Sequence, residues 1–129
     1  MLKANNIIKD KCYHFALRIV KLYEFLKDNK KEYTLSKQVL KSGTSIGANV
    51  EEAEAGQTKK DFLTKMATAS KEARETLYWL KLLRDSGYIE KRLAKSLTDD
   101  AEELARVLTA IVKTTQKSLM AEKFKRQRF

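Results

Sequence analysis

Four stretches of the sequence carry apolar residues at intervals of three or four positions. In the first stretch these residues are Ile8, Cys12, Phe15, Ile19, Leu22 and Leu26. Such spacing places the apolar side chains on one face of an α-helix, whereas a strand would alternate at every second residue. The 129 residues include no proline and only four glycines, which is too few turn residues for a β-rich or multidomain chain. The pattern predicts a single all-α domain.

The four apolar stretches give the expected bounds of the helices. They lie at about residues 5–28, 35–55, 59–86 and 90–119. Because the helices have similar lengths and short connections, we expect an antiparallel up-down four-helix bundle over residues 1–120. Residues 121–129 carry four basic residues and one acidic residue and are expected to form a frayed tail.

Local signals at the helix ends support these bounds. Thr58 is followed three residues later by Asp61, which resembles a capping box with Thr58 as the N-cap of the third helix. Thr34 or Ser36 is expected to accept the free amides that open the second helix. Gly56 is placed to close the second helix in a left-handed conformation.

The second helix contains an unusual run of small residues. Gly43 and Gly47 each cost about 1 kcal/mol of helix stability relative to alanine, so their presence favours the close approach of another helix. The residues that belong to this motif are Ser42, Gly43, Ser45, Ile46, Gly47, Asn49 and Glu52. We interpret the motif as a helix-packing surface in preference to a ligand groove. The neighbouring helix can belong to the same chain or to another copy.

The chain carries 27 basic and 17 acidic residues, a formal net charge of +10, which allows an anionic partner such as RNA or DNA. The candidate phosphate contacts are Lys9, Lys11, Arg18, Lys59, Lys60, Lys123, Lys125, Arg126 and Arg128, with Lys3 and Lys65 as further basic candidates. Runs of charge usually form a solvated face, so nucleic-acid binding and its absence are weighed equally.

Compartment signals are few. Cys12 is the single cysteine, so no disulfide forms within one chain, as is typical of a reducing compartment. No apolar run approaches the roughly 18 residues that a membrane span requires. The first residues lack the apolar core and cleavage site of a signal peptide. We expect a cytoplasmic protein that has no membrane partner.

Two sequence motifs resemble those of a known family. Residues 42–53 are similar to the SI-x-x-N-[IV]-x-E-[AG] signature of bacterial four-helix-bundle proteins known as 23S-rRNA intervening-sequence proteins. Residues 71–83 resemble the KEA-x-E-[TS]-x-YWL-x-LL helix of the same family, and the resemblance covers about residues 5–119. It implies a bundle that assembles into a ring of five copies. A related group of proteins accompanies reverse transcriptases in diversity-generating retroelements and is thought to bind nucleic acid.

The polar positions of the two motifs are Asn49, Glu52, Glu72 and Glu75. A catalytic or metal-binding carboxylate cluster is one interpretation, but di-metal bundles also use Glu-x-x-His pairs, and the single histidine, His14, is in no such pattern. We favour a buried or interfacial hydrogen-bond network. Catalysis by Cys12 and His14 is disfavoured because Cys12 lies on the apolar face. No catalytic residue, metal or cofactor is expected.

Large apolar residues also occur away from the main apolar faces. They are Ile7, Tyr13, Tyr23, Phe25, Leu40, Tyr78, Trp79 and Leu82. One bundle cannot bury them all, which favours contact with another copy of the chain. Tyr78 and Trp79 could stack on nucleobases, although packing at an interface is the favoured interpretation.

Together these observations predict a non-enzymatic, homo-oligomeric helical scaffold that binds structured nucleic acid, such as ribosomal RNA, through basic surfaces. The alternative is a protein-binding adaptor, for example an accessory to a reverse transcriptase. An enzyme is disfavoured because the sequence contains no nucleophile–base, metal-binding or phosphate-cradling pattern.

Overall fold

The computed structural model describes the backbone of residues 2–127 and the side chains of residues 6–127. This part of the chain forms four helices and no strand, which confirms the predicted all-α class. The helices are α1 (Leu2–Asp28), α2 (Leu35–Ala55), α3 (Lys59–Asp85) and α4 (Lys91–Gln127). None of them combines the length and apolar character needed to cross a membrane.

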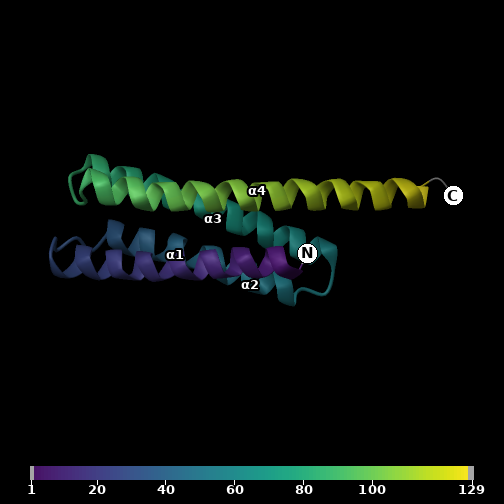
Figure 1. Cartoon of the computed structure of the whole chain (residues 1–129), viewed down its shortest axis with the longest axis horizontal. Coiled ribbons are helices and arrows are strands. Elements are labelled where there is room, and N and C mark those ends of the chain that lie inside the picture. The colour runs from purple at the N-terminus through teal and green to yellow at the C-terminus, as the bar shows by residue number, and fades with distance from the viewer. Residues whose placement is uncertain (1, 128–129) are drawn as a thin grey trace.

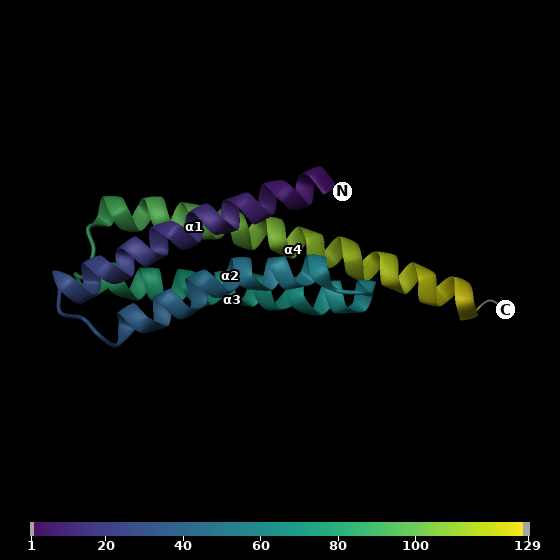
Figure 2. The ribbon, with the colours of Figure 1, turned by 90° about the horizontal axis from the view of Figure 1, so that it is seen from below.

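Successive helices lie side by side and run in opposite directions (Figures 1 and 2). Each helix packs on the next one along the chain, and α4 returns beside α1, where the contact is the least extensive of the four. The core lies between the helices and is filled by the residues of the apolar faces. On α1 these are Ile8, Cys12, Phe15, Ile19, Leu22 and Leu26, all buried as their spacing predicts.

The close approach of α2 to α1 occurs within one chain, at the two glycines. A Cβ atom added to Gly43 would lie 2.9 Å from the Cγ1 and Cγ2 atoms of Ile19 on α1. At Gly47 the added atom would lie 3.2 Å from the Cβ atom of Cys12. Because neither position has room for an ordinary side chain, the glycines set the spacing between the two helices.

The serine of the same motif faces a different helix. Ser42 is fully buried and accepts a hydrogen bond of 2.9 Å from the hydroxyl of Thr76 on α3, which is also buried. The small residues of α2 therefore serve two contacts, the glycines with α1 and Ser42 with α3. Both neighbours belong to the same bundle.

Of the predicted helix caps, the one at Thr58 is right, and those at Gly56 and at the start of α2 are wrong. Thr58 caps α3, since its side chain accepts a hydrogen bond from the backbone N–H of Asp61. Gly56 ends α2 with a φ of −65°, which is an extended and not a left-handed conformation. The glycine with positive φ is Gly87, at 81°, in the turn between α3 and α4.

The start of α2 also differs from the prediction. Neither Thr34 nor Ser36 caps this helix with its side chain; the carboxylate of Glu32 accepts the backbone N–H groups of Thr34, Leu35 and Ser36. A carboxylate has two acceptor oxygens and a full negative charge, so it satisfies several free amides at the positive end of the helix.

Helix α4 is longer than predicted. It continues to Gln127. From the sequence, its end was expected near residue 119, with a frayed segment after residue 120. In Figures 1 and 2 its C-terminal turns extend past the ends of the other three helices. The side chains of residues 120–127 are all exposed, and one of them, Glu122, pairs with Lys59 at the start of α3.

Candidate nucleic-acid interface

The four polar residues of the sequence motifs do not form one cluster. Glu52 forms an ion pair of 2.8 Å with Lys65, and the amide of Asn49 donates to the backbone carbonyl of Ser45 on its own helix. Among the described residues, no hydrogen bond or ion pair joins any two of Asn49, Glu52, Glu72 and Glu75, which leaves the predicted shared network without a direct link. The buried polar link between these helices is instead the one from Thr76 to Ser42.

Glu72 and Glu75 lie on neighbouring turns of the exposed side of α3. Partial burial raises the pKa of the Glu72 carboxyl, and the nearby negative charge of Glu75 raises it further. Glu75 accepts a weak hydrogen bond of 3.4 Å from the indole of Trp79. Within residues 6–127 no group of three histidine, cysteine or acidic side chains is placed to hold a metal ion.

Cys12 is not arranged as a nucleophile. Its side chain is fully buried against α2, and burial raises the pKa of the thiol to about 12, with a smaller contribution from Glu51. A thiol with this pKa remains protonated at neutral pH, and the thiolate is the reactive form. His14 is exposed on the outer side of α1.

Most of the predicted phosphate contacts on α1 and at the start of α3 are engaged in ion pairs with carboxylates of this chain. The pairs are Lys9 with Glu54 and Glu51, Lys11 with Glu103, Arg18 with Asp100, and Lys59 with Glu122. A cation that is already paired gains less from a phosphate, because it must release its own carboxylate first. Each of these ion pairs joins two different helices of the bundle.

The other predicted contacts lie elsewhere. Lys60 is exposed at the start of α3, and Lys123, Lys125 and Arg126 are exposed on the last turns of α4. No carboxylate of the described chain pairs with any of these four residues. Arg128 lies outside the described residues.

A further set of cations lines the outer side of α3 and α4. On α3, one row contains Lys60, Thr64, Ala67, Lys71, Arg74 and Tyr78, at alternating intervals of four and three, and all of these except the half-buried Ala67 are exposed. On α4, a row with the same spacing contains Arg106, Ala110, Lys113, Lys117, Met120 and Phe124. Such spacing keeps each row on one face of its helix. Neither row contains an acidic residue.

We call the six cations of these rows the basic groove: Lys60, Lys71 and Arg74 from α3, and Arg106, Lys113 and Lys117 from α4. None of the six forms an ion pair with a carboxylate in the described part of the chain. The acid-free row on α4 ends at Arg106, since the preceding positions on the same face are Glu102 and Asp99. The groove therefore has a definite electrostatic boundary.

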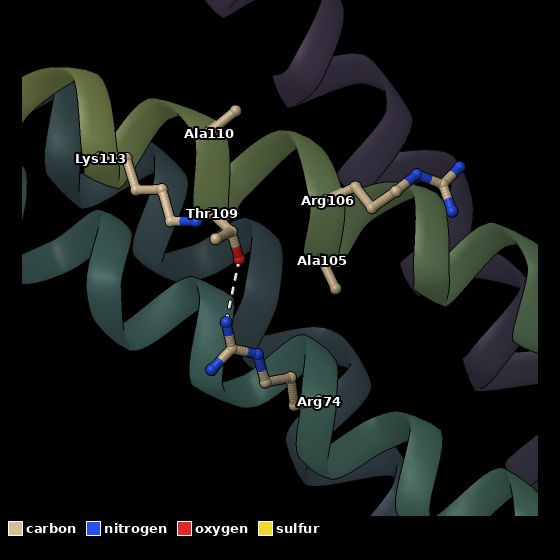
Figure 3. A pocket seen from close by; sticks show the side chains of 6 residues that line it. All are labelled: Arg74, Ala105, Arg106, Thr109, Ala110 and Lys113. Carbon is tan, nitrogen blue, oxygen red and sulfur yellow. Dashed lines mark hydrogen bonds between the residues drawn. The ribbon is translucent and has the colours of Figure 1, made fainter.

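The two rows meet at a shallow pocket of about 490 Å³ between α3 and α4 (Figure 3). It is lined by Arg74, Ala105, Arg106, Thr109, Ala110 and Lys113. The guanidinium of Arg74 donates a hydrogen bond of 3.1 Å to the hydroxyl of Thr109, which also bonds to Ser70 at 3.0 Å. In Figure 3 Arg74 and Lys113 extend toward Thr109, while the guanidinium of Arg106 points away from it.

Thr109 orients Arg74 at the mouth of this pocket. The short side chains of Ala105 and Ala110 leave space for a ligand to approach the charged groups. The planar guanidinium group of arginine and the ammonium group of lysine both bind phosphate oxygens. The phosphate contacts predicted from the sequence did not include Lys71, Arg74, Arg106, Lys113 or Lys117. The signal that identifies them is the helical spacing of exposed basic residues in rows that contain no acidic residue, since they form no continuous run.

Two aromatic residues of the second motif lie next to each other on α3. Tyr78 is 60% exposed, whereas Trp79 is half-buried against the core. Their rings are 5.1 Å apart and nearly perpendicular. Trp79 thus packs within the bundle, and Tyr78 presents its ring to solvent one helical turn after Arg74.

Fold and surface together define a class of protein: a small all-α bundle in which the outer sides of α3 and α4 each carry a row of basic residues without an acidic residue. The family model of the 23S rRNA-intervening sequence protein matches residues 4–110. The chain therefore belongs to this family, as its two motifs predicted. Residues 111–127, the C-terminal part of α4, lie beyond the matched region.

A solved structure supports the same assignment. The chain is similar to a protein of unknown function from the S23 ribosomal protein family of Bacteroides thetaiotaomicron VPI-5482, with 48% sequence identity and a TM-score of 0.84. The similarity covers 85% of this chain and 98% of that one. No curated protein matches the chain.

Proposed function

We propose that this protein is a non-enzymatic, self-associating helical bundle that binds structured nucleic acid, such as ribosomal RNA, through the basic groove. The observation that carries the proposal is the set of six cations on the outer side of α3 and α4. None of these cations forms an ion pair within the described chain, so they can neutralise phosphates without first releasing a carboxylate partner.

Phosphate neutralisation is the main source of sequence-independent affinity for nucleic acid, because each contact releases condensed counterions. The pocket between Arg74 and Lys113 offers two converging cations and a hydroxyl, which suits a phosphate group. Contacts of this kind fix the position of a nucleic acid and read no bases. The proposal is therefore binding without strong sequence preference.

Self-association would multiply the groove by the number of copies. An apolar stripe on the outer face of α1 supports it: Tyr13, Leu17 and Val20 are 66%, 45% and 38% exposed and follow one another at intervals of four and three. They lie on the side of α1 away from its buried face. Contiguous exposed apolar residues usually mark an interface. The resemblance to ring-forming proteins suggests five copies.

The proposal is tested by mobility shifts with ribosomal RNA across a salt series. We expect binding at low salt that weakens as salt rises, and weaker binding for the charge reversal Lys113→Glu. The matched control is Lys37→Glu, an exposed lysine on α2 without an ion pair in the described chain. Absence of binding even at low salt would end the proposal. An equal loss for both variants would show that net charge matters and the groove does not.

The α1 stripe also fits a second candidate function, an adaptor that binds another protein, such as a reverse transcriptase. Here Tyr13, Leu17 and Val20 would contact the partner and not another copy. Molar mass by light scattering distinguishes the two. If the wild type is oligomeric and Leu17→Glu is monomeric, the stripe joins copies. A monomeric wild type that co-purifies with a polymerase favours the adaptor.

A further inference from the structure

We infer that the basic groove takes an unpaired stretch of RNA or DNA, with bases stacked on the rings of Tyr78 and Phe124. This inference rests on the proposed function and narrows it, because it names the conformation of the nucleic acid and two aromatic contacts. It combines the electrostatics of the groove with the exposed rings that belong to the same two rows.

The two rings belong to the rows that carry the cations. Tyr78 follows Arg74 by four residues on α3, and Phe124 follows Lys117 by seven residues on α4. Both intervals keep the ring on the same face as the cation. The rings are 60% and 66% exposed, and neither belongs to the buried core.

Exposed rings favour an unpaired strand over a duplex. In a duplex the base faces are covered by neighbouring base pairs, so a surface ring cannot reach them. In an unpaired strand each base face is available to an aromatic side chain, and such stacking tolerates any base. A surface that bound only duplex phosphates would gain nothing from Tyr78 or Phe124.

The length of the groove matches a chain of phosphates better than a single phosphate. On α4 the row from Arg106 to Phe124 extends about 27 Å along the helix axis. The Lys59–Ser118 and Ser70–Thr109 contacts show that α3 and α4 run antiparallel, which places Tyr78 toward the Arg106 end of the groove. One ring therefore lies near each end, and the cations lie between them.

The projecting end of α4 leaves Phe124 accessible. In Figures 1 and 2 the last turns of α4 extend beyond the other helices, and the ring of Phe124 in these turns is 66% exposed. On the face of α4 that carries the row, acidic side chains begin at Glu102 and Asp99, beyond Arg106. Charge and aromatic exposure thus agree on a polyanion with accessible bases.

The test compares a 12-nucleotide unstructured RNA with a 12-base-pair duplex by fluorescence anisotropy at fixed salt. We expect Tyr78→Ala and Phe124→Ala each to weaken binding of the single strand by about 5- to 150-fold, the range for loss of one stacked base. Binding of the duplex should change less than twofold. Tyr78→Phe keeps the ring and should retain single-strand affinity.

A matched control is Tyr33→Ala, which removes a ring that is 53% exposed in the connection between α1 and α2. It should leave both affinities unchanged. Equal losses for single strand and duplex, or no loss in either alanine variant, would overturn the inference while leaving the proposed function intact. If neither RNA binds the wild type at low salt, the proposed function itself fails.

Discussion

At the scale of single residues, Gly43 and Gly47 should tolerate substitution to different degrees, because their neighbours on α1 differ. In Gly43→Ala the new Cβ would be 2.9 Å from two atoms of Ile19, which is fully buried. Overpacking of this kind costs about 1–3 kcal/mol, which offsets or exceeds the gain of about 1 kcal/mol in helix propensity. At Gly47 the shortest new contact would be 3.2 Å, to Cys12.

We therefore expect Gly43→Ala to have a lower free energy of unfolding than Gly47→Ala, by about 1 kcal/mol or more. Urea denaturation of both variants measures this difference. A Gly43→Ala variant that is as stable as Gly47→Ala would contradict the close approach of α2 to α1 at Gly43.

The buried hydroxyl pair of Ser42 and Thr76 allows a second prediction at this scale. Thr76→Val keeps the side-chain shape but removes the donor to Ser42, so the free energy of unfolding should fall by about 1–2 kcal/mol. The double variant Ser42→Ala/Thr76→Val removes both polar groups and should lose less than the sum of the single changes. A double-mutant cycle by urea denaturation tests this coupling, and strict additivity would argue against the hydrogen bond.

The buried thiol of Cys12 gives a prediction about reactivity. Because its pKa is raised to about 12, the folded protein holds the thiol in its protonated form at pH 8. Reaction with a disulfide reagent such as Ellman's reagent should therefore be slow for the native protein and rapid in urea. The ratio of the two rates at pH 8 is the measurement. Rapid reaction without denaturant would show that the thiol is accessible or ionised.

At the scale of helices, the sequence was most informative where structure depends on local spacing. The apolar faces and the Thr58 cap are set by residues within one or two helical turns. The cap of α2 was missed because Glu32 lies outside the helix and reaches it only through the turn that contains Lys31, whose φ is 53°. Preference rules for caps favour serine and threonine and contain no such loop conformation.

The C-terminal end of α4 should be less stable than the packed part of the same helix. Residues 123–127 are exposed on all sides, and short helical segments without packing are only marginally stable in water. Amide hydrogens of residues 123–127 should exchange faster than those of any other part of α4. They should exchange far faster than those near the buried residues Leu104 and Leu108. Hydrogen exchange followed by mass spectrometry tests this. Equal protection along α4 would indicate that a partner covers its end.

At the scale of the whole molecule, the basic groove could not be predicted from the net charge of +10. That charge is spread over the chain, and part of it is cancelled by contacts between distant residues, such as Lys11 with Glu103 and Arg18 with Asp100. Which cations are cancelled depends on how the helices are rotated about their axes, and sequence spacing alone does not give this rotation. The family motifs predicted the bundle itself but named none of the residues of the pocket.

The distinction between total charge and groove charge leads to a last prediction, on the salt dependence of binding. Each phosphate neutralised on a single strand contributes about 0.7 to the slope of log affinity against log salt concentration. Arg106→Ala/Lys113→Ala removes two groove cations and should therefore lower the magnitude of the slope by about 1.4 for an unpaired RNA. The control Lys30→Ala/Lys37→Ala changes the net charge equally with exposed lysines outside the groove, and its slope should equal that of the wild type. If both double variants lower the slope to the same extent, RNA contacts the molecule through its overall charge, and the arrangement of cations along α3 and α4 has no special role.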